Sequence, residues 1–258
     1  MSRESSPARA ALAWLPNSLT TANLVLGFLS ILTCASAARL AAPDVAGREY
    51  EQACWLILWA AIFDVLDGKV AKLTGATSEL GMRLDTFADA TTFGLAPSLL
   101  LYCAFLRGPG MGGLGWAAAG AYFLAASFRL ARYNVQTKGP VRFGFTGLPT
   151  PAAAMMATTL FLSTRESPPK ASLVAVLMVL LALVMVSPLR YPDFKGLKPR
   201  ERNVVLALVS GLIFPTLFYG PAKVLFGLIS TFALVWGYWW IPLRHRWVPG
   251  VMPEERLT

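Results

Sequence analysis

Four aspartates in an otherwise apolar stretch are the residues of this sequence best suited to chemistry. Asp64 and Asp67 are three positions apart, and Asp85 and Asp89 are four positions apart. On a helix, residues at these spacings project from the same face. A charged side chain at the centre of a bilayer costs roughly 2.5–3.5 kcal/mol on insertion scales, so four of them need compensation. The pattern predicts that the carboxylates meet and bind divalent cations.

Nitrogen and sulfur ligands are scarce in the sequence, which restricts the metal. The single histidine is His245, and the three cysteines (Cys34, Cys54 and Cys103) form no CxxC pair. Carboxylate oxygens favour hard cations such as Mg²⁺, Mn²⁺ or Ca²⁺. Two aspartate pairs on antiparallel helices would offer enough oxygen for two bridged metal ions, an arrangement suited to displacement at phosphorus.

The helices that must position the aspartates lie in a sequence of membrane type. The chain has 258 residues, of which 55% are hydrophobic and 14% are charged, whereas soluble domains average about 25% charged residues. Apolar windows long enough to cross a bilayer occur at residues 18–41, 51–73, 81–106, 114–136, 148–164, 171–189, 203–219 and 221–243. We therefore predict an all-α polytopic membrane helix bundle with about eight transmembrane helices.

The distribution of lysine and arginine indicates the orientation of the bundle. These residues concentrate in the connections on one side, including residues 190–202, and such an excess marks the cytoplasmic side. Both termini and the aspartates are therefore predicted to face the cytoplasm, most simply in a bacterial inner membrane. The net charge of +9 fits attraction to anionic lipid, and we expect no nucleic-acid partner because no nucleic-acid-binding motif occurs.

The spacing around the aspartates resembles a known signature. The motif D-x2-D-G-x2-A-K-x8-G-x3-D-x3-D, from Asp64 to Asp89, is similar to that of the CDP-alcohol phosphotransferase family, which normally has Arg where this chain has Lys72. The segments PNSLTTANLVLGFLSI, LDTFADATTFGLAPS, FRLARYNVQ and FTGLPTPAAA resemble the branch of this family that uses CDP-diacylglycerol and serine. The resemblance covers about residues 15–155.

The resemblance implies an activity and a domain organisation. The activity is metal-dependent transfer of a phosphatidyl group from CDP-diacylglycerol to the hydroxyl of L-serine, giving phosphatidylserine and CMP, with two Mg²⁺ or Mn²⁺ ions and a homodimer. The expected parts are a cytoplasmic amphipathic lead at residues 1–15, a catalytic membrane region at 16–164, C-terminal transmembrane helices at 165–243 and a cytoplasmic tail at 244–258.

The resemblance also implies a role for each motif position. Asp64 and Asp85 would bridge two metals, Asp67 would help to hold one metal, and Asp89 would hold the other and act as the general base. The expected site for cytidine diphosphate consists of Asp67, Gly68, Ala71, Lys72, Ser78, Gly81 and Asp85. Lysine offers a point charge where arginine offers a planar fork, so Lys72 changes one phosphate contact.

Five further polar residues have a functional and a structural interpretation. The functional one is binding of the acceptor, a lipid phosphate or the nucleotide, by side chains suited to anions or hydrogen bonds. The structural one is anchoring at the cytoplasmic face or hydrogen bonding between helices. These residues are Arg83, Arg129, Arg132, Thr20 and Asn23.

Two alternatives to serine transfer stay open at this level. A same-family enzyme would use another alcohol, such as glycerol 3-phosphate, inositol phosphate or choline, because the short motif says least about the acceptor. A small cation-coupled transporter belongs to a different class. It would be expected to spread its carboxylates over several spans rather than hold them in one motif.

Overall fold

The computed structural model describes residues 7–74, 79–136, 145–188 and 190–191, and within these ranges it is an all-α protein. Six helical segments run through the described chain. Five of them are α1 (Pro7–Ala37), α2 (Pro43–Thr74), α5 (Gly112–Gln136), α6 (Thr150–Thr164) and α7 (Ala171–Val186). The other is a continuous rod built from α3 (Glu79–Asp89), η1 (Ala90–Leu95), α4 (Ala96–Leu101) and η2 (Tyr102–Leu106), in which η1 and η2 are π-helical turns.

The first six predicted windows coincide with these six segments. The main difference is at the start, where α1 begins at Pro7 and continues through Pro16, instead of beginning at residue 18. Among the described residues, two stretches are long and apolar enough to cross a membrane, Asn17–Ala37 and Glu79–Leu106, while α7 is a shorter apolar helix. The windows at 203–219 and 221–243 lie outside the described residues, so eight spans and the positions of both termini stay predictions.

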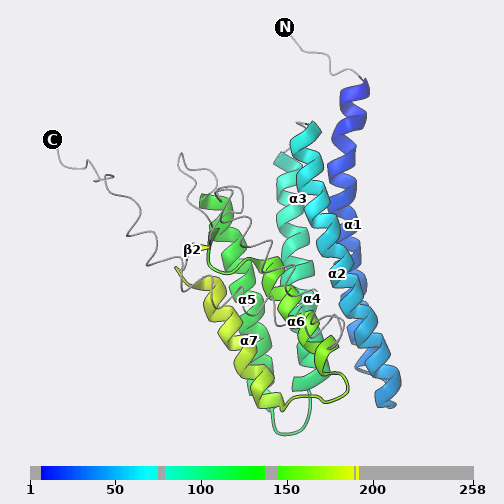
Figure 1. The fold of residues 1–258 in the computed structure, drawn as a ribbon, viewed down its shortest axis with the longest axis vertical. Helices are drawn as coiled ribbons and strands as arrows, with labels where there is room; N and C mark the ends of the chain where they lie inside the picture. Colours follow the sequence, from blue (N-terminus) through cyan, green and yellow to red (C-terminus); the bar gives the residue numbers. More distant parts are fainter. Residues whose placement is uncertain (1–6, 75–78, 137–144, 189, 192–258) are drawn as a thin grey trace, which may run out of the picture.

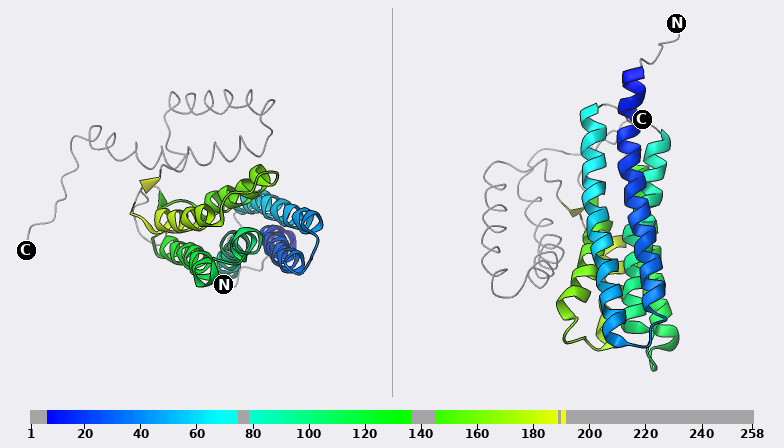
Figure 2. Two further views of the ribbon diagram at one scale, coloured as in Figure 1. Left: turned by 90° about the horizontal axis from the view of Figure 1, so that it is seen from below. Right: turned by 90° about the vertical axis from the view of Figure 1, so that its right-hand side faces the viewer.

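The helices form an elongated bundle in which one rod occupies the middle (Figures 1 and 2). Helices α1 and α2 run side by side along one edge, and α5 packs against α7 along the other. The rod from α3 to η2 lies between these pairs and contacts both, while α6 packs on α2 and α4. The rod therefore connects every helix that contributes a candidate site residue.

Two groups of buried apolar side chains hold this arrangement together. One joins the C-terminal end of the rod, at Leu101 and Leu106, to α5, α6 and α7 around Tyr122 and Met178. The other joins α1, α2, η1 and α6 around Ile57 and Phe93. Large apolar side chains also cover the outer surface, including Phe28, Leu32, Trp55, Trp59, Leu180 and Leu183. An apolar core inside an apolar exterior is what a lipid-embedded bundle requires, because its solvent is hydrocarbon.

The rod that carries Asp89 packs closely against α1 at Thr92, three residues after Asp89. A Cβ atom placed on Gly27 would clash with the side chain of Thr92, whose hydroxyl donates to the Asn23 carbonyl at 3.1 Å. Glycine is therefore needed at position 27 for the two backbones to approach this closely. The π-helical turn η1 begins directly after Asp89. Such turns within α-helices are frequent at functional sites.

The end of α7 is joined to the connection between α5 and α6 by contacts that the sequence analysis did not predict. Strand β1 (Phe145–Thr146) pairs antiparallel with β2 (Arg190–Tyr191). Gly147 follows β1 with a φ of +78°, and a Cβ there would meet the Met185 carbonyl. This short pairing does not change the all-α class, but it fixes where α5, α6 and α7 meet.

Candidate active site

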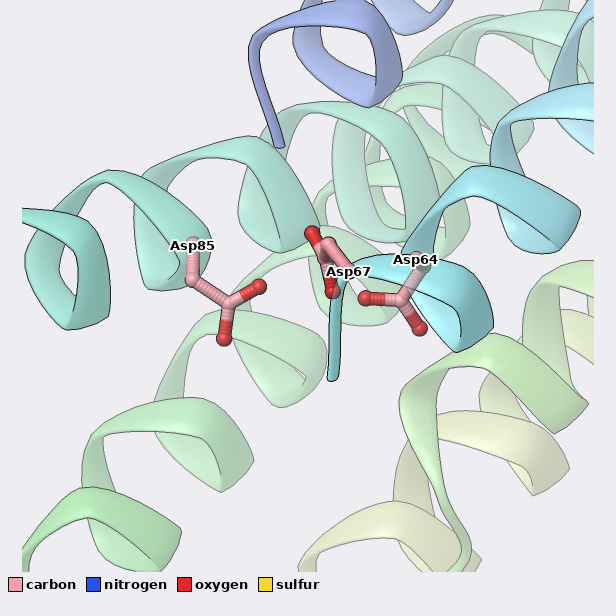
Figure 3. Close-up of side chains that lie close together, drawn as sticks. All are labelled: Asp64, Asp67 and Asp85. Atoms are coloured by element: carbon pink, nitrogen blue, oxygen red, sulfur yellow. The ribbon is translucent and has the colours of Figure 1, made fainter. Parts of the chain in front are cut away.

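Three of the four motif aspartates converge between the end of α2 and the start of the rod (Figure 3). One carboxylate oxygen from each of Asp64, Asp67 and Asp85 can be chosen so that all three oxygens lie within 4.8 Å of one another. Asp64 and Asp67 come from one face of α2, and Asp85 comes from α3. The expected juxtaposition of the two helices is confirmed for these three residues.

Asp67 is the most enclosed of the three and is held by a residue of α1. Its side chain is 6% exposed, and the Thr20 hydroxyl donates a hydrogen bond of 2.8 Å to its Oδ2 atom. A buried carboxylate needs such a donor, because burial without hydrogen bonds is costly. Thr20 therefore acts on the cluster by orienting a carboxylate.

Asp89 adjoins the cluster through Asp64. The two carboxyl groups are within hydrogen-bonding distance of each other, although they come from different helices. The Asp89 Oδ1 atom is buried and has no hydrogen-bond partner among the described residues. Two adjoining carboxylates repel each other unless a proton or a cation lies between them. A cation bound at this pair would relieve that repulsion.

The donor set fits a hard divalent metal. Only carboxylate oxygens take part, which is the preference of Mg²⁺, Mn²⁺ and Ca²⁺. Oxygens on opposite sides of one octahedral ion at about 2.1 Å are about 4.2 Å apart, so the 4.8 Å spread needs only a small closure. The orphaned Asp89 Oδ1 atom is one more oxygen available to a cation. The cluster can therefore hold a metal, and nothing in it selects one hard cation over another.

The Thr20 contact gives a prediction for metal affinity. Replacing Thr20 by Val removes the donor to Asp67 while keeping the shape of the side chain, and outer hydrogen bonds to metal ligands are typically worth about 10- to 100-fold in affinity. We expect Mn²⁺ to bind about 10-fold more weakly to the variant in a titration followed by electron paramagnetic resonance.

Thr21→Val is the matched control for that experiment. Thr21 is exposed, and its hydroxyl donates to the Asn17 carbonyl of the same helix at 2.7 Å. This change should leave Mn²⁺ affinity unaltered. Equal affinities for the wild type and Thr20→Val would show that Thr20 does not support the metal site.

The predicted nucleotide positions are only partly described. Gly68 faces open space, since a Cβ there would meet nothing within 4 Å. Ala71 and Gly81 are half-buried beside the aspartate-bearing faces. The side chain of Lys72 and the whole of Ser78 lie outside the described residues. The open backbone at Gly68 leaves room for a ligand to approach.

The three candidate arginines have different surroundings. Arg129 on α5 is 5% exposed and donates from Nη1 to the Thr150 hydroxyl at 2.7 Å, and it interacts electrostatically with Asp89. Arg132 donates to the carbonyls at the end of α7, including that of Val186 at 2.7 Å. Arg83 is exposed and pairs with Glu79 at 2.7 Å. The structure thus places Arg129 beside the aspartates and gives the other two structural contacts.

Two further buried polar residues, Asn23 and Thr150, lie near the site. Asn23 is fully buried, and neither polar atom of its side chain has a partner in the described part of the chain. Thr150, at the start of α6, was missed by the sequence analysis. Its partner Arg129 is 21 positions away, so no local spacing could have linked the two residues.

Comparison with known proteins gives concordant results. The sequence model of the CDP-alcohol phosphatidyltransferase family matches residues 13–187. A CDP-diacylglycerol–serine O-phosphatidyltransferase of Helicobacter pylori is 34% identical over 198 residues, covering 75% of this chain and 78% of the relative. An archaetidylserine synthase of Methanothermobacter thermautotrophicus is 33% identical over 193 residues, with 71% of each chain covered. The aspartate cluster lies within the residues that match the family model.

Proposed function

This chain belongs to the CDP-alcohol phosphatidyltransferase family, and from that premise we propose that it is a CDP-diacylglycerol–serine O-phosphatidyltransferase. It transfers the phosphatidyl group of CDP-diacylglycerol to the hydroxyl of L-serine, and the products are phosphatidylserine and CMP. The observation that carries this proposal is the carboxylate cluster of Asp64, Asp67 and Asp85, found in a chain whose relatives carry that activity in their names.

The choice of serine as acceptor is supported by the relatives. The Helicobacter pylori protein is named as a serine O-phosphatidyltransferase, and the Methanothermobacter thermautotrophicus protein as an archaetidylserine synthase. Neither name mentions glycerol 3-phosphate, inositol phosphate or choline, so the alternative acceptors lose support. The transporter hypothesis loses support as well, because the carboxylates are concentrated at one place and the family is enzymatic.

The roles proposed for the aspartates follow their positions in the cluster. Asp64 and Asp85, which lie close together on α2 and α3, would help to hold two ions, Mg²⁺ or Mn²⁺. Asp67, oriented by Thr20, and Asp89, beside Asp64, would contribute the other carboxylates. Ions held there would neutralise the pyrophosphate of the donor lipid and the negative charge that develops on CMP.

The chain's own groups then handle the donor and the proton. Asp89 accepts the proton of the serine hydroxyl, whose oxygen forms a bond to the phosphorus that carries diacylglycerol, while the bond from that phosphorus to the CMP oxygen breaks. The electron pair of the broken bond leaves with CMP. Positioning of the two substrates by buried, hydrogen-bonded side chains supplies much of the rate enhancement.

The cytidine diphosphate site is proposed to lie beside the cluster. Gly68 lets the ligand approach the α2 backbone, and Ala71 and Gly81 are small neighbours on the adjoining faces. Lys72 and Ser78 complete the site together with Asp67 and Asp85. Because lysine cannot make the bidentate contact of arginine, Lys72 is expected to serve as a point charge toward a phosphate.

The cellular setting is proposed from the same premises. Apolar helices in a family of membrane enzymes make this a membrane protein. We place the cluster and both termini at the cytoplasmic face of a bacterial inner membrane, because basic residues concentrate there. The catalytic region would span residues 16–164, and the enzyme would be a homodimer.

A direct assay tests the acceptor. The purified protein in detergent, with CDP-diacylglycerol and Mg²⁺ or Mn²⁺, is expected to release CMP when L-serine is added. Glycerol 3-phosphate, inositol phosphate and choline should not replace serine. Release that depends on one of these alcohols would keep the family and overturn serine as the acceptor. A folded protein that releases no CMP with any acceptor would contradict the proposed activity.

A further inference from the structure

Arg129 has an unusual environment for an arginine. Its side chain is buried at the end of α5, yet no carboxylate in the described part of the chain lies within ion-pair distance of it. We propose that Arg129 binds the carboxylate of the acceptor amino acid and that Thr150 holds its guanidinium in place for this purpose. The proposal rests on the proposed function, because it assigns the acceptor subsite of that reaction.

The hydrogen bonds of Arg129 leave one edge of the guanidinium for a ligand. Nη1 donates to the Thr150 hydroxyl at 2.7 Å, and the buried Nε atom has no partner among the described residues. A guanidinium stays charged in proteins, and burying it without an anion is costly. Nε and Nη2 form the planar edge that matches a carboxylate with two parallel hydrogen bonds. A bound carboxylate would accept the missing hydrogen bond from the Nε atom and would also neutralise the positive charge of the guanidinium.

The position of Arg129 relative to Asp89 fits a small amino-acid acceptor. The two side chains interact electrostatically without forming an ion pair within 4.0 Å, and the Asp89 Oδ1 atom is buried without a partner. Serine carries its hydroxyl and its carboxylate on neighbouring carbons of one short molecule. With the hydroxyl against Asp89, the carboxylate can reach Arg129 on the other side.

Contacts of Thr150 and Arg132 hold the Arg129 side chain in a fixed position. Thr150 is fully buried at the first turn of α6, after the helix-starting Pro149. Arg132, one turn beyond Arg129 on α5, is engaged with the last carbonyls of α7, such as that of Met185 at 3.1 Å. These contacts tie α5 to α6 and α7, so the Arg129 side chain is presented from a fixed frame. Arg132 is therefore a structural residue and not a second anion-binding group.

A carboxylate of the acceptor is favoured over a phosphate of the lipid by the side from which Arg129 approaches. The proposed nucleotide positions lie on α2 and α3, together with the cluster that faces the pyrophosphate. Arg129 and Thr150 come from α5 and α6, which carry none of the proposed nucleotide positions. The donor's phosphates and the acceptor's carboxylate would thus have separate sets of partners.

Selectivity between two acceptors is the most direct test. L-serine is compared with serinol, which has a hydroxymethyl group in place of the carboxylate, and CMP release is measured with wild type, Arg129→Lys, Arg129→Gln and Thr150→Val. Losing a hydrogen-bonded charge partner typically costs about 10- to 100-fold. For Arg129→Gln we expect the KM for serine to rise by about that factor, with the KM for CDP-diacylglycerol unchanged and the preference for serine over serinol lost.

The other variants separate binding from structure. Arg129→Lys should recover part of the preference for serine, because it keeps the charge without the fork. Thr150→Val should raise the KM for serine by a smaller factor, since only the orientation of Arg129 is lost. Arg48→Gln removes an exposed arginine near the start of α2, 16 positions before Asp64, and should behave as wild type. Lys and Val at these positions are mild changes, so they keep the test open if Arg129→Gln fails to fold.

Each remaining outcome counts against the assignment in a distinct way. A higher KM for CDP-diacylglycerol in Arg129→Gln, with the serine preference intact, would make Arg129 a phosphate-binding residue and overturn the proposal. Unchanged selectivity in all three variants would overturn it too. A wild-type protein without serine-dependent CMP release would instead contradict the proposed function itself.

Discussion

Asp89→Asn is expected to lower the serine-dependent release of CMP by about 10²- to 10⁴-fold, the usual contribution of a positioned general base. Asparagine has nearly the same shape but cannot accept the proton of the serine hydroxyl. It also removes one of the carboxylates that adjoin Asp64. The measurement is the initial rate of CMP release at saturating CDP-diacylglycerol, serine and Mn²⁺, so that weaker binding does not mimic a slower chemical step.

Asp44→Asn is the control for this substitution. Asp44 lies in the first turn of α2 and is exposed, at the opposite end of the helix from Asp64, so the same chemical change should leave the rate unaltered. Thermal unfolding in detergent checks that both variants fold. If Asp89→Asn keeps more than about a tenth of the wild-type rate, Asp89 is not the base, since a base contributes about 10²-fold or more.

Asp85→Asn is expected to remove most of the activity through the metal. Asp85 is the only residue of the rod among the three whose oxygens gather within 4.8 Å, so the cluster without it is confined to the end of α2. Removing one electrostatic contact to a developing charge commonly costs about 10²- to 10³-fold in rate, and loss of a metal ligand should cost at least that much. We expect the Mn²⁺ concentration for half-maximal activity to rise sharply.

A binding measurement separates this effect from a general loss of activity. Mn²⁺ titration of the protein without substrates, followed by electron paramagnetic resonance, should show weaker binding to Asp85→Asn. Glu79→Gln, at an exposed carboxylate of the same helix that pairs with Arg83, should bind as wild type. Equal Mn²⁺ affinity in Asp85→Asn and wild type would remove Asp85 from the metal site. Prior dialysis against a chelator should abolish wild-type activity, and Mn²⁺ or Mg²⁺ should restore it.

The features that depend on short separations along the chain can be predicted from the amino-acid sequence alone. Spacings of three and four residues place Asp64 with Asp67 and Asp85 with Asp89 on helix faces, and a short connection brings the two helices together, so the cluster could be anticipated. The six helical segments that coincide with the predicted windows follow from runs of apolar residues. The family and the proposed chemistry can also be predicted from the sequence, because both are indicated by one short motif, from Asp64 to Asp89.

The side chains that contact the cluster from distant parts of the chain could be identified only from the packing of the helices. Thr20 reaches Asp67 across 47 positions, and Arg129 meets Thr150 while Arg132, three residues on, reaches the end of α7 more than 50 positions away. Local periodicity cannot distinguish the two arginines, because both lie near the same end of α5. Their roles are set by which helices pack beside each side chain, and helix packing depends on contacts spread over the whole bundle.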